Sequence, residues 1–274
     1  IRGAVNSMLL LGDEQRARGG GAHSSGNHAI AVAHAGAVLG IPVTVVMPDD
    51  APRVKQARTR ALGARVEVVG PGSDERVARA TELAASEGLA LVEPYDSRAV
   101  LAATATIAVE VLEDLRELGS GGSPVIFVPV SGGGLAGGVA AGAKLLDPRV
   151  RIVAVEPEVA ADYVASRRAG ERIAFTVEQM ARTAADGLRV QQVGALAWPH
   201  LEAYVDDAVT VSEAEIRDAA ARTWVETGLV AEPSGAVSIA AALASAAVAS
   251  TALASAVGPS VAVLSGANTD HPPG

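Results

Sequence analysis

The chain has 274 residues, of which 49% are hydrophobic and 19% charged, and its formal net charge at pH 7 is −9. This composition is typical of a globular protein long enough for two domains, and its acidic balance offers no basic patch for nucleic acid or an anionic membrane. Cysteine is absent, which excludes disulfides, thiolate nucleophiles and cysteine-ligated zinc. No apolar run is as long as a membrane span and no charged-then-apolar leader begins the chain, so we expect a cytoplasmic protein.

The hydrophobic pattern predicts strands that alternate with helices. Short apolar or β-branched runs favour strands, and longer stretches with helical spacing that end at glycine favour helices. Because the predicted strands are apolar on both faces, we expect an α/β protein with parallel sheets covered by helices. In chain order, the predicted elements are a helix over 4–18, a helix over 28–39, a strand over 42–48, a helix over 52–62, a strand over 65–69, a helix over 73–86, a strand over 89–92, a helix over 99–118, a strand over 125–130, a helix over 135–146, a strand over 151–155, a helix over 212–226, a long alanine-rich helix from about 234, and a strand over 260–264. Residues 157–208 show no regular pattern.

A polar loop lies between the glycine run 19–21 and the helix predicted at 28–39. We expect its polar atoms to gather at a helix N-terminus, where free backbone N–H groups attract an anion. The simpler interpretation is a capped helix start, because Ser and Asn are common N-cap residues. The loop consists of Ser24, Ser25, Gly26, Asn27 and His28.

A glycine-rich loop joins the strand predicted at 125–130 to the next helix. Small residues let a backbone wrap an anion, and the helix N-terminus supplies N–H donors. The same loop also matches the G-x-G-x-x-G pattern, with Glu156 about where a ribose-binding acid would lie, so an NAD(P)-dependent oxidoreductase is an alternative. A further alternative is that the glycines only allow close helix packing. The loop reads Ser131, Gly132, Gly133, Gly134, Leu135, Ala136 and Gly137.

The last predicted strand ends in the polar sequence Ser265-Gly266-Ala267-Asn268. Polar groups at the C-terminal edge of a parallel strand face the crevice where α/β proteins bind ligands. One ligand in contact with this loop and with the two loops at 24–28 and 131–134 would explain all three.

The order of these motifs, with Glu-Pro-Ser-Gly at 232–235, resembles the fold-type II pyridoxal-phosphate enzymes, and within them it is most similar to the serine/threonine dehydratase and serine racemase family. The similarity extends from Ile1 to Asp270. It implies two open, twisted, mostly parallel sheets flanked by helices, as in the tryptophan synthase beta-like fold. The implied domains are a smaller, mobile one at 20–97 on the substrate side and a larger one made of 1–19 and 98–274 that holds the cofactor.

The family carries its Schiff-base lysine in a Phe-Lys-x-Arg-Gly-Ala segment, whose second half matches Arg2-Gly3-Ala4. The resemblance therefore implies that this lysine immediately precedes Ile1, outside the numbered chain. We interpret its absence as a chain that starts after it or as a modified residue left out of the numbering. A lysine-less, non-catalytic ligand-binding relative is the remaining alternative.

The resemblance also implies roles for the three loops. Asn27 is expected to bond the cofactor's phenolic oxygen, the backbone of Ser131 to Leu135 its phosphate, and Ser265 its pyridine nitrogen. A hydroxyl at that nitrogen does not stabilise a fully protonated ring, so charge that develops at the substrate Cα is less delocalised and a β-hydroxyl is expelled more readily. The loop 24–28 is expected to bind the substrate carboxylate, with Ser25 as an acid/base group on the face opposite the lysine. His28 is expected to orient or pack rather than to catalyse.

Arg76 departs from the local pattern, because it occupies the capping-box position of the helix that begins at Ser73, where Glu is the usual residue. The resemblance implies a role for Arg76, because the serine racemases have a matching arginine near the side-chain end of the substrate and plain threonine dehydratases generally lack it. If Arg76 faces the site in the same way, a second carboxylate on the substrate, as in 3-hydroxyaspartate, could pair with it bidentately. A solvated surface arginine is the alternative. Asp186 matches a family segment on the substrate side.

A divalent cation site is expected after the strand at 151–155. Two carboxylates and a carbonyl around a turn suit Mg²⁺, Mn²⁺ or Ca²⁺, and the resemblance implies Glu156, the carbonyl of Ala160 and Asp162 as ligands. An exposed acidic turn is the alternative.

The expected function is a lyase that uses pyridoxal 5'-phosphate to deaminate serine, threonine or 3-hydroxyaspartate to a 2-oxo acid and ammonia, with serine racemisation as a second activity. The expected partners are a small amino-acid substrate and further copies of the chain, in a homodimer or higher homo-oligomer.

Overall fold

The computed structural model describes residues 1–24, 26–70, 73–249 and 258–269. The chain divides into two compact units, Ile1–Ala103 and Thr104–Gly274. Each unit contains a four-stranded sheet in which every neighbouring pair of strands is parallel. The predicted fold class is therefore confirmed. None of the helices within the described residues is long and apolar enough to cross a membrane.

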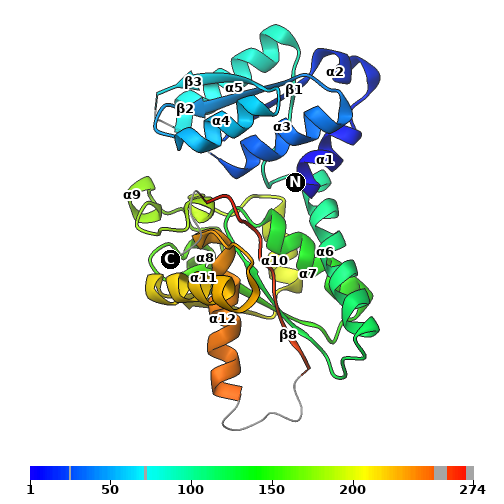
Figure 1. Ribbon diagram of the computed structural model, residues 1–274, viewed down its shortest axis with the longest axis vertical. Coiled ribbons are helices and arrows are strands. Elements are labelled where there is room, and N and C mark those ends of the chain that lie inside the picture. The colour runs from blue at the N-terminus through cyan, green and yellow to red at the C-terminus, as the bar shows by residue number, and fades with distance from the viewer. Residues whose placement is uncertain (25, 71–72, 250–257, 270–274) are drawn as a thin grey trace. The chain divides into compact units, whose positions relative to one another are not determined.

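The sheet of the first unit has the strand order β3-β2-β1-β4. Helix α1 packs against α3 (Figure 1). The apolar core lies between these helices and the sheet, and Met8, Val32 and Val45 are fully buried in it. The elements of this unit are α1 (Arg2–Leu9), α2 (Asp13–Arg18), β1 (Gly20–His23), α3 (Asn27–Leu39), β2 (Val43–Pro48), α4 (Arg53–Ala61), β3 (Arg65–Val69), α5 (Ser73–Glu87), β4 (Ala90–Leu91) and the first residues of α6 (Arg98–Glu117).

In the described part of the first unit, β1 is the strand that the sequence did not predict. The glycine run was expected only to end a helix over 4–18, but that stretch forms two helices, α1 and α2, and the glycines form a central strand. A Cβ at Gly20 would lie 3.3 Å from the Met8 side chain, and one at Gly21 would lie 3.2 Å from the Leu91 side chain. Glycine in this strand therefore permits close packing, which strand propensity alone does not indicate.

The unit boundaries differ from the predicted domains at residues 1–19 and 98–103. These segments fall in the first unit, because α1 packs on α3 and contributes Ala4 and Met8 to its core. The division into a smaller, mobile domain at 20–97 and a larger domain made of 1–19 and 98–274 stays a prediction.

The sheet of the second unit has the strand order β7-β6-β5-β8. Side chains of β5 alternate between two cores: Ile126 and Val128 pack with α7 and α10, whereas Val125 and Phe127 pack with α11 and α12. The sheet is therefore covered on both faces, as the apolar strands predicted. The elements are α6, β5 (Val125–Pro129), α7 (Gly134–Leu146), β6 (Arg151–Pro157), α8 (Asp162–Ala169), α9 (Val177–Met180), the 3-10 helix η1 (Asp186–Leu188), α10 (Ala197–Tyr204), β7 (Asp207–Val211), α11 (Glu213–Thr227), α12 (Pro233–Ala249) and β8 (Ser260–Ala262).

Candidate functional site

Two of the predicted loops leave the same edge of the second sheet. The loop at 131–134 follows β5, and the loop at 265–268 follows β8. Because β5 and β8 are parallel neighbours, with Val125 opposite Ser260, their C-terminal ends lie side by side. The structure thus brings these two loops together, at the edge where α/β proteins bind ligands.

The glycine-rich loop has the geometry of an anion site. Gly133 is the N-cap of α7 and has φ +88°, a left-handed conformation that favours glycine. A Cβ at this position would lie 2.9 Å from both Ala197 and Leu201 of α10, so the loop packs against that helix without a side chain. The first N–H groups of α7 have no carbonyl partner within the helix and carry the positive end of its dipole. A phosphate group fits this cradle.

Three contacts fix this loop from outside it. The hydroxyl of Ser131 accepts the N–H of Val190 at 3.3 Å, and the carbonyl of Gly132 accepts the N–H of Gly194 at 3.0 Å. The buried hydroxyl of Thr104 donates to the carbonyl of Gly134 at 2.8 Å. No pattern in the sequence indicates this role of Thr104, because only the fold brings α6 beside the loop.

The loop at 265–268 rests on the first turn of α12. The N–H of Glu232 donates to the carbonyl of Gly266 at 3.1 Å. A Cβ at Gly266 would overlap the Glu232 carboxylate, and a Cβ at Gly235 would overlap the Gly266 carbonyl. The Glu-Pro-Ser-Gly motif at 232–235 therefore serves as the seat of this loop, and Ser265 itself is exposed.

Asp186 begins η1 and is held beside the same helix. The hydroxyl of Ser234 accepts the N–H of Gly187 at 2.9 Å and lies 3.4 Å from Oδ1 of Asp186. The structure thus joins the segment around Asp186 to the loop around Ser265 through α12. Ser234 and Glu232 were noted in the sequence only as part of a motif, and no local pattern indicates these contacts.

Glu156 and Asp162 form a buried acidic pair at the end of β6. Glu156 is 1% exposed, and its carboxylate accepts the N–H groups of Tyr163 at 3.1 Å and Val164 at 2.7 Å, at the N-terminus of α8. Asp162 is fully buried, and neither of its carboxylate oxygens has a hydrogen-bond donor among the described residues. Burial raises the pKa of Asp162 to about 7 and, together with the neighbouring Asp162 charge, raises that of Glu156.

The environment of Glu156 bears on two of the alternatives. A buried carboxylate bonded to the turn of α8 is not the exposed acidic turn that we considered, and it does not present itself to a ribose. Ala160, in the same turn, is also buried. In the described part of the chain, no three His, Cys, Asp or Glu side chains gather as a metal cluster, so a cation here would need the backbone carbonyl as well.

The loop at 24–28 lies in the first unit, between β1 and α3. Gly26, not Ser or Asn, is the N-cap of α3, and no side chain of the described residues caps this helix. The hydroxyl of Ser24 instead accepts the N–H of Gly26 at 3.1 Å. Ser25 lies outside the described residues. The alternative of a side-chain-capped helix start therefore stays a prediction for Ser25, and Asn27 begins the helix at the edge where a ligand would bind.

Two side chains of the first unit, those of His28 and Lys55, lie at this loop. Nε2 of His28 donates to the carbonyl of Val92 at 2.8 Å, and burial lowers the pKa of His28 to about 4, so its ring is neutral at pH 7. Lys55, one of only two lysines in the sequence, is 6% exposed, and its Nζ would lie 3.1 Å from a Cβ at Gly26. In the sequence, only the rarity of lysine distinguishes Lys55 from other polar residues.

Arg76 lies on α5 and is half-buried. Its Nε is buried and has no hydrogen-bond partner among the described residues. Burial lowers the pKa of Arg76, and the nearby charge of Asp50 opposes this shift. The solvated surface arginine that we considered as an alternative does not match this environment, because a buried guanidinium nitrogen without an acceptor is costly.

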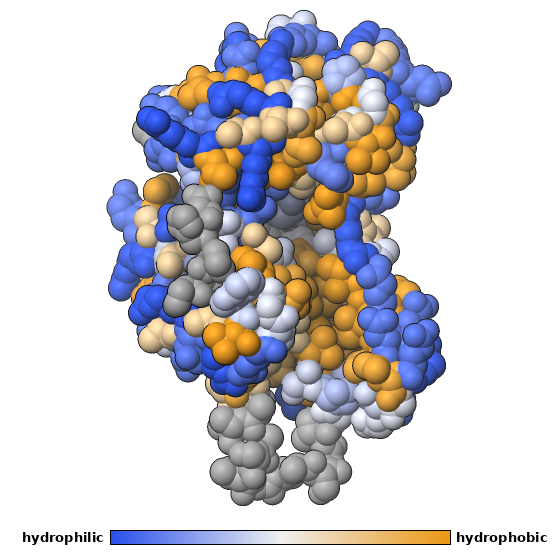
Figure 2. Space-filling model, in the orientation of Figure 1, coloured by the Kyte–Doolittle hydropathy of each residue, from blue (hydrophilic) through white to orange (hydrophobic). Residues whose placement is uncertain are grey.

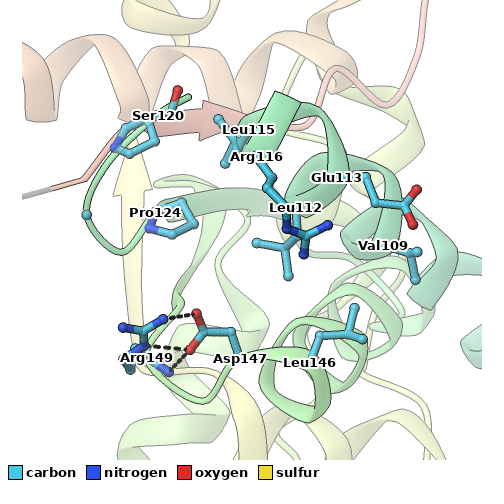
Figure 3. A pocket seen from close by; sticks show the side chains of 12 residues that line it. Val109, Leu112, Glu113, Leu115, Arg116, Ser120, Pro124, Leu146, Asp147 and Arg149 are labelled. Atoms are coloured by element: carbon cyan, nitrogen blue, oxygen red, sulfur yellow. Dashed lines mark hydrogen bonds and ion pairs between the residues drawn. The ribbon is translucent and has the colours of Figure 1, made fainter. Parts of the chain in front are cut away.

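The second unit also contains a pocket of about 340 Å³ at the end of its sheet opposite the loops at 131–134 and 265–268 (Figure 3). It is lined by Leu112 and Arg116 of α6, by the ion pair of Asp147 and Arg149, and by Pro124 and Pro259, which directly precede β5 and β8. It therefore lies at the N-terminal edge of the sheet, opposite the glycine-rich loop, and is not part of the candidate site.

Comparison with known proteins finds one family that matches nearly the whole chain. The chain matches the family described as pyridoxal-phosphate dependent enzyme over residues 1–266. It is 38% identical to a serine racemase of Arabidopsis thaliana over 89% of this chain and 71% of that protein. It is 36% identical to an L-threo-3-hydroxyaspartate ammonia-lyase of Saccharomyces cerevisiae over 98% of this chain and 78% of that protein.

A solved structure of the processed form of threonine deaminase isoform 2 from Solanum lycopersicum superposes with a TM-score of 0.88 at 35% identity, and the match covers 98% of this chain and 75% of that one. The oxidoreductase alternative for the glycine-rich loop is set aside by these matches. The chain belongs to the fold-type II pyridoxal-phosphate-dependent enzymes, in the serine racemase and threonine dehydratase family.

Proposed function

We propose that this enzyme deaminates a β-hydroxy amino acid to a 2-oxo acid and ammonia. Support comes from the relatives, whose names include serine racemase, threonine deaminase and 3-hydroxyaspartate ammonia-lyase. Pyridoxal phosphate supplies the electron sink for such a reaction when it is bound. The chain's own residues hold and orient the reactants, and serine racemisation is a second activity that the same residues would support.

For the cofactor, we propose that the backbone N–H groups of Ser131 to Leu135 hold the phosphate. The left-handed Gly133 and the N-terminus of α7 support this assignment, because they form a cradle for an anion. Ser265 is proposed to face the pyridine nitrogen and Asn27 the phenolic oxygen. A hydroxyl at the pyridine nitrogen favours loss of the β-hydroxyl group of the substrate. This preference is the main reason to propose a lyase rather than an aminotransferase.

For the substrate, we propose that Ser24, Gly26 and His28 form a carboxylate site at the N-terminus of α3 with Asn27. The neutral His28 ring would keep this loop in place without adding charge. Ser25 is proposed to hold or deliver a proton on the face of the substrate opposite the lysine. A pair of opposed acid/base groups inverts Cα, whereas elimination needs only one of them.

The proposed preference is for a substrate with a second carboxylate, such as 3-hydroxyaspartate. The buried, unpartnered Nε of Arg76 is the observation that carries it, because a guanidinium left without an acceptor among the described residues is poised for a bidentate carboxylate. Asp186 is proposed to lie on the substrate side as well, where its carboxylate would attract the amino group.

A divalent cation is proposed at Glu156, the carbonyl of Ala160 and Asp162. The support is the burial of both carboxylates and the absence of any donor to Asp162 among the described residues. Two buried carboxylates repel each other unless they bind protons or a cation, and oxygen ligands of this kind suit Mg²⁺, Mn²⁺ or Ca²⁺.

Assembly and location remain predictions: a homodimer or higher homo-oligomer, in the cytoplasm. On the face seen in Figure 2, apolar side chains lie among polar ones in both units. The second unit exposes Leu118 and Leu145, each 77% exposed. Light scattering of the full-length protein measures the oligomeric state directly.

The proposed function is tested on the purified full-length protein. We expect a visible absorbance band that borohydride abolishes, together with release of ammonia and a 2-oxo acid from serine, threonine or 3-hydroxyaspartate. A protein that is colourless with added pyridoxal phosphate, or that binds it but releases no ammonia from any of the three, would contradict the proposal.

A further inference from the structure

The first turn of α12 contacts two segments that come from distant parts of the second unit. On one side, the hydroxyl of Ser234 accepts the N–H of Gly187 at 2.9 Å, and its own hydrogen is directed at Oδ1 of Asp186, 3.4 Å away. Ser234 is only 4% exposed, so this bond is shielded from water. A serine in the first turn of a helix more often bonds to its own backbone, and this one bonds to another segment instead.

On the other side, the same turn carries the loop that follows β8. The N–H of Glu232 donates to the carbonyl of Gly266 at 3.1 Å, and both Gly235 and Gly266 lack the space for a Cβ where they meet. The loop and the helix turn are therefore packed together with no room for a side chain between them. Ser265 is the neighbour of Gly266, so its position is set by this helix turn.

The segment around Asp186 is held from a third direction. The carboxylate of Glu213, on α11, accepts the hydroxyl of Thr183 at 2.6 Å and the N–H of Ala184 at 2.9 Å. Thr183 in turn accepts the N–H of Ala185 at 3.1 Å. With one end fixed to α11 by Glu213, the bond to Ser234 decides where the turn at Asp186 and Gly187 lies relative to α12.

We infer that Ser234 is a positioning residue, whose hydroxyl holds the turn of Asp186 and Gly187 in register with the loop of Ser265 on one helix turn. This inference rests on the proposed function, in which Asp186 faces the substrate and Ser265 the cofactor. The position of the Asp186 carboxylate relative to the loop of Ser265 then depends on a single hydroxyl, which would set how tightly the substrate is held beside the cofactor.

The test compares Ser234→Ala, which removes the hydroxyl, with Ser234→Thr, which keeps it. Ser238→Ala is the matched control, because Ser238 lies one turn further along α12, is fully buried and donates to the carbonyl of Val263 at 2.8 Å. The first measurement is hydrogen exchange at the Gly187 amide in the full-length protein without substrate. We expect exchange to be roughly tenfold faster in Ser234→Ala, and close to wild type in Ser234→Thr and Ser238→Ala.

The second measurement is steady-state kinetics with serine, threonine and 3-hydroxyaspartate. We expect Ser234→Ala to raise KM about five- to tenfold with little change in kcat, because the Asp186 contact acts on bound substrate and transition state alike. Ser234→Thr should restore KM. Unchanged exchange at Gly187 in Ser234→Ala, or an equal change in Ser238→Ala, would overturn the inference. If the wild-type protein turns over none of these amino acids, the proposed function fails, while the exchange measurement still decides the role of Ser234.

Discussion

Gly133 faces Leu201 so closely that a Cβ added at position 133 would lie 2.9 Å from Cδ1 of Leu201. We therefore expect Gly133→Ala to lower the free energy of unfolding by about 2–4 kcal/mol, through the left-handed backbone and the steric overlap together, and to weaken cofactor binding. Gly170→Ala is the control, since Gly170 has φ +73° and open space around its Cβ position. It should cost only about 1 kcal/mol. Urea unfolding and a cofactor titration measure both effects, and equal losses in the two variants would contradict the steric explanation.

The buried ring of His28 predicts a loss of stability in acid. Burial lowers its folded-state pKa from 6.5 to about 4, so the unfolded chain binds more protons between these pH values. The free energy of unfolding should therefore fall, by about 1–3 kcal/mol, as the pH decreases from 6.5 to 4. His28→Gln, which keeps a donor for the Val92 carbonyl, should flatten this dependence. The same change at the exposed His200 should leave it intact; unfolding midpoints across this pH range that do not differ between the two variants would argue against the assignment.

Arg76→Ala should change substrate choice. Loss of a bidentate carboxylate contact is expected to lower kcat/KM for 3-hydroxyaspartate by about 10- to 100-fold and that for serine by less than about threefold. Arg79→Ala is a suitable control, because Arg79 lies one turn further along α5 and pairs with Glu82 at the surface. Selectivity that stays the same in Arg76→Ala would remove the reason to favour a dicarboxylic substrate.

Removal of divalent cations should destabilise the second unit. If Glu156 and Asp162 bind a cation that is present at 100 times its Kd, chelation with EDTA is expected to cost about 2.7 kcal/mol and to lower the melting temperature by several degrees. Mg²⁺, Mn²⁺ or Ca²⁺ should restore it. Asp162→Asn should no longer respond, whereas Asp147→Asn, at a surface ion pair with Arg149, should respond like wild type. A melting temperature indifferent to EDTA would refute the site.

Ser25→Ala should separate the two proposed activities. Without an acid/base group on the second face, racemisation of serine is expected to fall by about 10²- to 10⁴-fold, whereas elimination should fall far less. Chiral chromatography of the remaining serine and an ammonia assay follow both reactions in one mixture. Equal losses would show that Ser25 has no special role on that face.

Elements with strong local signals could be predicted from the sequence. The helix predicted over 212–226 is α11, which begins at Glu213 after a capping box in which the hydroxyl of Ser212 accepts the Glu215 N–H at 3.2 Å. The apolar run in 125–130 predicted β5, and its burial on both faces follows from the same residues. The glycine-rich loop after it was located correctly because composition and the strand-to-helix order point to the same place.

The remaining features depend on contacts between distant segments. Gly20 and Gly21 lie in a strand that pairs with β2 and β4 and packs closely against Met8 and Leu91. Glycine is depleted in strands, so its β-propensity does not predict this strand. The pairing of Ser234 with Gly187, and of Thr104 with Gly134, arises when helices are packed, so the sequence carries no local trace of it. The sequence marked Glu156 as a candidate cation ligand or ribose-binding acid, but its two bonds to the turn of α8 required the fold.

The strand orders of the two sheets imply that the sheets can be completed at different stages of synthesis on the ribosome. All strands of the first sheet lie between Gly20 and Leu91, so this unit has every strand it needs before the second is made. In the second sheet, β5 pairs with β8, whose first residue is Ser260. One edge of β5 therefore stays open until nearly the whole of this unit has emerged, and an open edge in an apolar strand is where nascent chains aggregate. Chaperone dependence should accordingly concentrate on the period in which the second unit is translated.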